Sequence, residues 1–470
     1  MKVNTLFEHT AEIIKISYNR ITPTDALISD IFRKRKNYGS KERKFIVNTL
    51  YFYFRNKLLI EYLAKNSQVN NIKSKEFPYL SSVVISVILV FLFESDFHDY
   101  KPYEILKKID KEFLLDDFLK YTFNLDYEQI SEEIIELYTK LSNEIKLSSY
   151  QELIENKLDK LEILYSFPKL LLTNIIQQKK YKTDLIDFLE NSRHQAPISI
   201  RVNTLKTNVD ALKKAMEENA IIAENSKVIP NSLLLEQRVQ FNELSLYRQG
   251  LFEVQDEGSQ LIGLFLEPKP KEYILDACAG AGGKSLHIAE LQKDSGKVVA
   301  NDIEYNRLKE IPKRAVRSGL KSIEISLSIT KSSQSALQEY EFDKVLVDAP
   351  CSGSGTIRRD PLKKFRINQR LLNKLAENQL RILENYAKYT SINGILVYST
   401  CSFLDDENIK IVNEFLSRNA NFEPVSVSEF LTKNNLSEFL NQISENTISI
   451  DFGKTTSDGF FMAKFRRIGE

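Results

Sequence analysis

The segment Leu275–Ser285, LDACAGAGGKS, constrains the fold of this chain more than any other part. It joins the apolar run Tyr273–Ala277, which has the composition of a strand, to a helix-like stretch from Lys284 through a loop of small residues. Strand-like and helix-like stretches then alternate almost to the end of the sequence. Such alternation predicts an α/β domain with a mainly parallel sheet over residues 269–470.

The pattern predicts further strands at 297–302, 323–327, 344–348, 394–400 and 459–466. It predicts further helices from Glu304 and at 333–340, 369–389 and 406–417.

The preceding residues predict two other domains, because 470 residues suffice for about three domains of ordinary size. Residues 1–190 are poor in Gly and Pro and carry apolar residues at three- and four-residue spacings, which predicts an all-helical domain. Residues 191–268 predict a small α+β unit, with strands in Ile198–Lys206 and Ser232–Leu235 and a helix over Asp210–Glu218.

Composition excludes several classes of protein. The net charge of +1 argues against a uniformly basic nucleic-acid coat, so any basic surface must be local. Three cysteines without a CxxC pair and four scattered histidines provide neither a disulfide framework nor a metal cluster. The apolar run Val83–Phe93 is too short to span a bilayer, and we interpret it as a buried core helix. We expect a cytoplasmic monomer without metal or membrane contact.

The glycine loop fits neither of two common phosphate-binding motifs. A P-loop would need glycine where Cys278 stands, and the dinucleotide fingerprint would need glycine where Ser285 stands. Asp302, at the end of the next predicted strand, is placed to accept hydrogen bonds from both ribose hydroxyls of an adenosine group. The loop therefore indicates an adenosine-bearing cofactor, and the alternative is a tight turn without a ligand.

Two cysteines follow the ends of two predicted strands. Cys351 lies in VDAPCSGSG and Cys401 lies in YSTCS. If these strands are neighbours in the sheet, both thiols project into the crevice beside the glycine loop. The alternative is that each is a small buried hydrophobe, the commonest role of a free cysteine.

These motifs resemble those of the Sun-type RNA cytosine-5 methyltransferases, whose sequences share a small-residue loop ending in GGK, an AP-Cys-SG segment and a Thr-Cys segment. The segments RVNTLK, FEVQDEGSQ, IRRDP and DGFFMAKF also look like family segments and occur in the family's order. The resemblance covers about residue 190 to the end. The helical first domain is similar in type to the antiterminator-like extension of the bacterial members that act on small-subunit ribosomal RNA.

The resemblance implies a Rossmann-like class I methyltransferase domain that uses S-adenosylmethionine. Thiolate addition to carbon 6 of cytosine makes carbon 5 nucleophilic, and a base must then remove the carbon 5 proton. By resemblance, Cys401 is the nucleophile and Cys351 assists product release. Asp348 would hold the target base or the cofactor amine, and Lys284 would lie near the cofactor or support the site. The residues expected to bind the cofactor are Cys278, by packing beneath it, Ala279, Gly280, Ala281, Gly282, Gly283, Lys284, Asp302, Arg307 and Asp348.

The sequence departs from the family at two points. Gly280-Ala281 stands where family loops often have Ala-Pro, and two small residues preserve close backbone approach. At the third strand end, where an Asp commonly contacts adenine, this chain has only hydroxyls such as Ser326, Ser328 and Thr330. Arg307 matches a family position, although a solvated helix residue is the alternative.

RNA is the expected partner, with small-subunit ribosomal RNA favoured over transfer RNA. Basic residues cluster at Thr356–Arg366, beside Cys351, where phosphate positioning is expected. For the second cluster, Phe32–Phe45, a solvated helix face is an equal alternative, and Arg201 and Asn203 would extend the RNA path. Two rivals remain: a noncatalytic RNA-binding assembly factor, which retention of both thiols disfavours, and methylation of a protein or small molecule.

Overall fold

The computed structural model describes residues 2–20, 23–72, 74–94, 96–97, 100–178, 181, 184–237, 239–327 and 341–469. The chain divides into two compact units. The first contains Met1–Gln195 together with Ile357–Arg366, and the second contains Ala196–Thr356 and Ile367–Glu470. The boundaries predicted at residues 190 and 268 stay predictions.

The first unit is helical in its described residues. Its helices are α1 (Val3–Tyr18), α2 (Thr24–Lys34), α3 (Ser40–Arg55), α4 (Lys57–Asn66), α5 (Leu80–Leu92), α6 (Pro102–Ile109), α7 (Leu115–Phe123), α8 (Tyr127–Lys146), α9 (Tyr150–Asn156), α10 (Leu158–Tyr165), α11 (Lys169–Ile176) and α12 (Leu185–Asn191). The apolar run Val83–Phe93 falls largely in α5, whose residues from Ser82 to Val90 are all buried, as expected of a core helix.

Residues after Gln195 first form a four-stranded antiparallel sheet. Its strands, in the order β2-β3-β1-β4, are β1 (Ile198–Val202), β2 (Ala223–Asn225), β3 (Ser232–Leu235) and β4 (Phe252–Val254). Helix α13 (Val209–Glu218) packs on β2 and β3, α14 (Ser245–Arg248) precedes β4, and α15 (Glu257–Phe265) leads to the larger sheet. The sequence predicted β1, α13 and β3 but not the three-residue strands β2 and β4.

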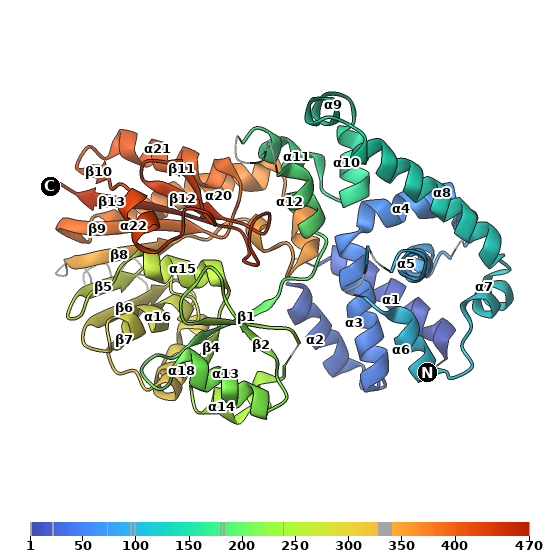
Figure 1. The fold of residues 1–470 in the computed structure, drawn as a ribbon, viewed down its shortest axis with the longest axis horizontal. Helices are drawn as coiled ribbons and strands as arrows, with labels where there is room; N and C mark the ends of the chain where they lie inside the picture. Colours follow the sequence, from blue (N-terminus) through green and yellow to red (C-terminus); the bar gives the residue numbers. More distant parts are fainter. Residues whose placement is uncertain are drawn as a thin grey trace. The chain divides into compact units, whose positions relative to one another are not determined.

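The larger sheet of the second unit has nine strands in the described residues, along the path β11-β12-β13-β9-β8-β5-β6-β7 with β10 beside β13. Five strands pair in parallel: β5 (Tyr273–Asp276), β6 (Lys297–Asp302), β7 (Ile323–Leu327), β8 (Phe342–Asp348) and β9 (Thr390–Thr400). Four pair antiparallel: β10 (Phe422–Pro424), β11 (Asn441–Ser444), β12 (Thr447–Ile450) and β13 (Phe460–Arg467). The expectation of a mainly parallel sheet thus holds for the strands from β9 to β7, which Figure 1 shows side by side.

Helices cover both faces of this sheet. They are α16 (Gly283–Leu291), α17 (Tyr305–Leu308), α18 (Ile311–Ser318), α20 (Gln369–Ala387), α21 (Ile409–Arg418) and α22 (Ser428–Lys433). Successive strand residues point to opposite faces, so Ile274 joins the core under α15 and α16 while Leu275 joins the core under α20 and α21. The helix predicted at 333–340 lies outside the described residues.

This arrangement brings the carboxyl ends of β5, β6, β8 and β9 to one edge of the sheet. Asp276, Asp302, Asp348 and Thr400 are the last residues of those four strands. The edge is where the sequence predicted the site.

Candidate active site

The glycine loop between β5 and α16 is tied by hydrogen bonds to the end of β6. The Ala279 amide donates to the Asn301 carbonyl at 2.8 Å, and the Gly280 amide donates to Oδ2 of Asp302 at 2.8 Å. Gly280 and Gly282 have φ values of +55° and +84°, in the left-handed region that favours glycine. These bonds and φ values define the backbone conformation of the loop, which lies directly against Asp302.

Two of the loop glycines also leave no room for a side chain. A Cβ on Gly280 would lie 2.7 Å from a guanidinium nitrogen of Arg307, and one on Gly282 would lie 2.6 Å from Cγ1 of Ile311. Arg307 thus lies against the loop, although the residue is exposed.

Asp302 and Asp276 flank the loop in different environments. Asp302 accepts the Gly280 amide through Oδ2 and the Glu304 amide, at 2.8 Å, through Oδ1. Asp276 is fully buried and accepts the Ser285 hydroxyl at 2.6 Å, while its Oδ1 has no hydrogen-bond partner. Burial raises the pKa of Asp276 from 3.8 to about 7. Sequence reasoning missed Asp276, although its position directly before the loop was the available signal.

Cys278 lies within the loop at partial exposure. Burial of its thiol, together with the nearby carboxylates, raises the pKa of Cys278 above its usual value. The thiol is therefore neutral near pH 7, and its packing beneath the cofactor stays a prediction.

Lys284 and Asp348 form an ion pair beside the loop. Nζ of Lys284 lies 2.7 Å from Oδ2 of Asp348, and the Ser399 hydroxyl donates to Oδ1 of Asp348 at 3.0 Å. Burial opposes the charge on Lys284, but Asp348 outweighs it, so the pKa of Lys284 is raised. The sequence predicted Lys284 and Asp348 but gave no signal for Ser399, a small polar residue at a strand end.

Cys351 and Cys401 meet at the same edge. Strands β8 and β9 pair in parallel with Asp348 opposite Ser399, so the two loops that follow leave the sheet side by side. The two Sγ atoms are 3.2 Å apart. The hydrogen bond with Cys401, followed by burial, raises the pKa of Cys351 well above its usual value. The Cys351 thiol is therefore neutral near pH 7.

Glu407 holds the Cys351 loop in place. Its carboxylate is buried and accepts hydrogen bonds from the Ser352 amide at 2.7 Å, the Ser352 hydroxyl at 2.5 Å, the Ser402 hydroxyl at 2.6 Å and the Gln379 amide group at 3.1 Å. Three acidic residues follow Cys401 in the sequence, Asp405, Asp406 and Glu407, and the sequence alone does not show which of them turns inward.

A close backbone crossing fixes the same loop from another side. The Gly459 amide donates to the Gly355 carbonyl at 2.9 Å, and the Gly355 amide donates to the Cys401 carbonyl at 3.0 Å. A Cβ on Gly355 would lie 2.0 Å from the Gly459 carbonyl oxygen. The start of β13 therefore packs directly on the loop that carries Cys351.

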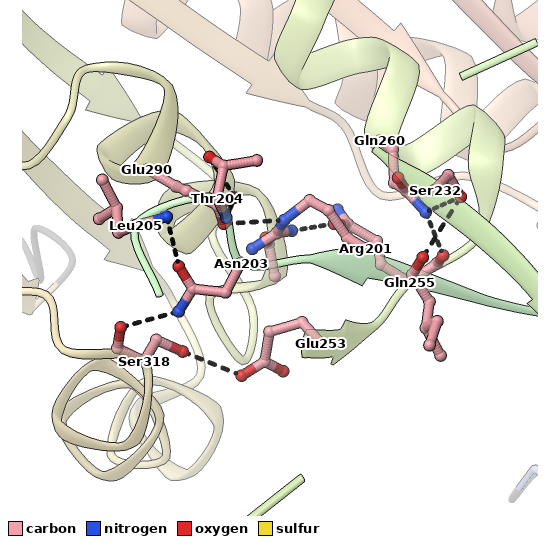
Figure 2. A network of polar contacts seen from close by, with 12 residues as sticks. Arg201, Asn203, Thr204, Leu205, Ser232, Glu253, Gln255, Gln260, Glu290 and Ser318 are labelled. Atoms are coloured by element: carbon pink, nitrogen blue, oxygen red, sulfur yellow. Dashed lines mark hydrogen bonds and ion pairs between the residues drawn. The ribbon is translucent and has the colours of Figure 1, made fainter. Parts of the chain in front are cut away.

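The prediction that Arg201 and Asn203 extend an RNA path is wrong, because both are 3% exposed. Figure 2 shows them inside a polar network, in which Nε of Arg201 lies 3.3 Å from Oε2 of Glu290. The Asn203 side chain donates to the Gly250 and Ser318 carbonyls at 2.8 and 2.9 Å. The strand pattern indicated which side chains share a face but not that this face is covered.

The basic cluster Thr356–Arg366, of which residues 357–366 belong to the helical unit, is only partly available for RNA because two of its basic residues are buried. Arg358 and Lys364 are 5% and 1% exposed, and Lys364 donates to the Arg55 carbonyl at 2.8 Å. Arg359 is the exposed basic residue of this segment. Charge alone does not reveal which members of a basic run are buried.

The second cluster, Phe32–Phe45, also lies in the helical unit. Its exposed basic residues are Arg33, Lys34, Lys36, Lys41, Arg43 and Lys44. Arg33 and Lys34 pair with Asp30, as on an ordinary solvated helix face. Because these basic residues are exposed, RNA binding also stays open as an alternative.

The remaining features considered from the sequence are the hydroxyls at the third strand end, metal-binding groups and membrane-spanning helices. Of the hydroxyls predicted at the third strand end, Ser326 lies in β7, and Ser328 and Thr330 lie outside the described residues. Across the described ranges, no group of three or more His, Cys, Asp or Glu is placed to hold a metal ion. No helix in the same part of the chain has both the length and the apolar character that crossing a membrane would require.

The layered α/β fold, with its glycine loop and its carboxylate at a strand end, is that of a class I methyltransferase. Residues 263–466 match the family model described as 16S rRNA methyltransferase RsmB/F, and residues 167–242 match the associated ferredoxin-like domain. The chain belongs to this family.

Relatives with known names agree with this assignment. Ribosomal RNA small subunit methyltransferase B of Shigella boydii is 31% identical over 67% of this chain and 69% of its own length. The probable methyltransferase B of Bacillus subtilis is 34% identical over 58% of this chain and 60% of its own. The chain thus spans about three-fifths of the length of the latter.

Among solved structures, PH0851 is 25% identical with a TM-score of 0.71 and covers 98% of both chains. NSun6 from Pyrococcus horikoshii, solved with SFG, shares the fold at 20% identity and a TM-score of 0.56, over 65% of this chain and all of its own. The predicted combination of a helical region, a small α+β sheet and a Rossmann-like domain is confirmed.

Proposed function

We propose that this protein transfers a methyl group from S-adenosylmethionine to carbon 5 of a cytosine in small-subunit ribosomal RNA, through a covalent adduct with Cys401. The observation that carries the proposal is the 3.2 Å approach of the Cys351 and Cys401 sulfurs beside the Lys284–Asp348 pair. A single buried thiol would suit packing. Two thiols in contact, at the ligand-binding edge of an α/β sheet, suit covalent catalysis better.

The residues at this edge fit the cofactor. A carboxylate has about four acceptor sites, and Asp302 uses two of them on the Gly280 and Glu304 amides, which leaves capacity for the ribose hydroxyls. The backbone of Gly280–Gly283 and the start of α16 would lie along the rest of the molecule, with Arg307 beside the loop. When bound, S-adenosylmethionine supplies an electrophilic methyl group.

Cys401 is the residue assigned to attack carbon 6. Lys284 lies close enough to interact electrostatically with Cys401. A cation beside a cysteine is a common way in which enzymes activate the residue as a nucleophilic thiolate. The raised pKa of Cys351 keeps a proton on the neighbouring sulfur, which can donate a hydrogen bond to that thiolate. Asp348 holds Lys284 in place and is positioned to bind the amino group of the base or of the cofactor.

Product release requires removal of the proton from carbon 5, after which the bond between the Cys401 sulfur and carbon 6 breaks. Cys351 lies beside that sulfur and is the residue we assign to assist this step. The target cytosine must be single-stranded or flipped out of a helix to reach two thiols at a sheet edge.

The names of the relatives support ribosomal RNA as the substrate, and from that substrate we infer a cytoplasmic location. A transfer RNA substrate and a noncatalytic role in assembly are the alternatives. Contact between the two thiols favours catalysis over a purely structural role.

Bisulfite mapping of cellular RNA tests the proposal. A strain that lacks the protein should lose one protected cytosine in small-subunit ribosomal RNA, and the wild-type gene should restore it while a gene for Cys401→Ala should not. Loss of protection in transfer RNA would select the first alternative. Unchanged protection at every cytosine would refute methylation.

A further inference from the structure

Two arginines hold carbonyls of the glycine loop: Arg201, which belongs to the network in Figure 2, and Arg314. Nη1 of Arg201, in β1, donates to the Gly283 carbonyl at 3.2 Å and also to the Gln255 side chain. Nη1 of Arg314, in α18, donates to the Ala281 carbonyl at 2.6 Å. Two of the four loop residues from Gly280 to Gly283 therefore have their carbonyls fixed by guanidinium groups.

Each arginine is itself fixed by a buried carboxylate. Arg201 bonds to Glu290, which is 6% exposed and also accepts the Thr204 amide at 2.9 Å. Gly283 and Glu290 both belong to α16 and lie seven residues apart, on one face of the helix, so Arg201 holds this helix at two points. Arg314 bonds to Glu253 of β4 at 2.9 Å, and Glu253 is 3% exposed.

A fixed carbonyl also fixes the amide of the next residue. The carbonyl of one residue and the N–H of the next share a planar trans peptide and point in opposite directions. Holding the Gly283 carbonyl therefore aims the Lys284 amide, one of the first-turn amides of α16 that the helix does not use. Holding the Ala281 carbonyl aims the Gly282 amide, which donates to the Ala279 carbonyl and closes the turn.

We propose that Arg201 and Arg314 are positioning residues that set the affinity for S-adenosylmethionine, so that the four-stranded sheet forms part of the cofactor site. The two arginines donate to carbonyls of the loop, whereas Asp302 accepts a hydrogen bond from a loop amide. The inference rests on the proposed function, because it takes the glycine loop as the place where the cofactor binds.

Arg314 and Arg317 provide a matched pair for the test. Both belong to α18 and bond to Glu253, and their side chains are 22% and 19% exposed. Arg314 holds a loop carbonyl, whereas the bond of Arg317 to Glu253 does not reach the loop. The variants Arg314→Gln and Arg317→Gln should therefore lower the melting temperature alike but differ in cofactor binding.

Isothermal titration of the full chain with S-adenosylmethionine measures the difference. Arg314→Gln should weaken binding roughly tenfold and raise KM for the cofactor more than it lowers kcat, whereas Arg317→Gln should stay within about twofold of wild type. Arg314→Lys, which keeps a donor, should recover part of the loss. Arg201→Met, with Asn203→Ala as its control, repeats the comparison on β1.

If the two variants bind S-adenosylmethionine with the same affinity, that affinity either equals the wild-type value or is reduced. Either result would overturn the inference and leave the proposed function intact. Absence of binding by the wild-type chain would instead overturn the proposed function itself.

Discussion

The sulfur atoms of Cys351 and Cys401 lie 3.2 Å apart, above two parallel strands that pair with Asp348 opposite Ser399. Their contact is therefore set by strand register, with each cysteine in the loop just beyond its strand. The loops are held in turn by Glu407 and by the crossing of Gly355 with Gly459. This support makes the two thiols separable by mutation, because neither is needed to hold the other's loop.

Cys401→Ala should reduce methyl transfer to background and form no adduct, because the attacking sulfur is absent. Cys351→Ala should still attack and should accumulate a covalent RNA–protein complex. Denaturing gels with labelled RNA measure both results, and the double variant, which should form no complex, is the control. Full activity in Cys401→Ala would exclude the mechanism.

Asp348→Asn should destabilise the protein most at neutral pH, because it leaves the buried Lys284 ammonium unpaired. In the wild type the raised pKa of Lys284 means that the pair stabilises the fold below about pH 10.5 and loses this effect above it. In the variant burial acts without Asp348 and lowers that pKa, so the deficit should shrink between about pH 7 and about pH 10. Melting temperatures across this range test the prediction.

The control for that experiment is Ser399→Ala, which removes a hydrogen bond to Asp348 but leaves the ion pair. Its melting temperature should differ from wild type by a constant amount over the same range. A constant deficit in Asp348→Asn as well would contradict the assigned role of Lys284.

Asp276→Asn should become more stable relative to wild type as pH rises. Because the pKa of Asp276 is raised from 3.8 to about 7, the native carboxyl favours the fold below about pH 4 and loses this contribution up to about pH 7. An amide keeps an acceptor for Ser285 and does not titrate, so the variant should gain about 1.4 kcal/mol per pH unit at most. Urea unfolding at about pH 5 and about pH 8 should show the change, and equal differences at both would speak against it.

Arg359→Gln should weaken RNA binding and reduce the slope of affinity against salt by roughly one, as expected for a lost phosphate contact. Lys364→Met should leave the slope unchanged, because Lys364 is 1% exposed and bonded to the Arg55 carbonyl. Burial and the nearby cations lower the pKa of Lys364, so its removal should cost little stability. Filter binding at several salt concentrations compares the two variants, and equal slopes would contradict the assignment.

Gly355→Ala should lower stability by about 1–3 kcal/mol and disturb the Cys351 loop, because a Cβ there would lie 2.0 Å from the Gly459 carbonyl oxygen. Gly469→Ala is the control, since its Cβ would meet Asn421 at an ordinary 3.8 Å. Melting temperatures of both variants should separate them, and equal values would show that the crossing is not tight in solution.

The sequence predicted the parallel half of the large sheet well, because buried strands such as Lys297–Asp302 are apolar runs that end in a polar residue. It missed β10, β11 and β12, which are only three or four residues long. Periodicity in such short segments is too weak to distinguish a strand from a loop.

Some residues of the candidate site could likewise be predicted from the sequence, and others could not. Residues carried by a local motif, such as Asp302 and Cys351, could be predicted from their position after a strand. Glu407 and Arg201 could not, because their importance comes from partners far away in the sequence, such as Ser352 and Gly283. A sequence pattern gives the face of an element, while tertiary contacts determine whether water or protein covers that face.

Residues 357–366 belong to the helical unit, although the chain on either side of them belongs to the other unit. The chain passes between its two units three times, after Gln195, after Thr356 and after Arg366. Deleting the first 195 residues would remove the surroundings that bury Arg358 and Lys364, only a few residues beyond the loop that carries Cys351. The helical unit therefore cannot be exchanged between relatives by replacing residues 1–195 alone. Residues 357–366 would have to be exchanged with it.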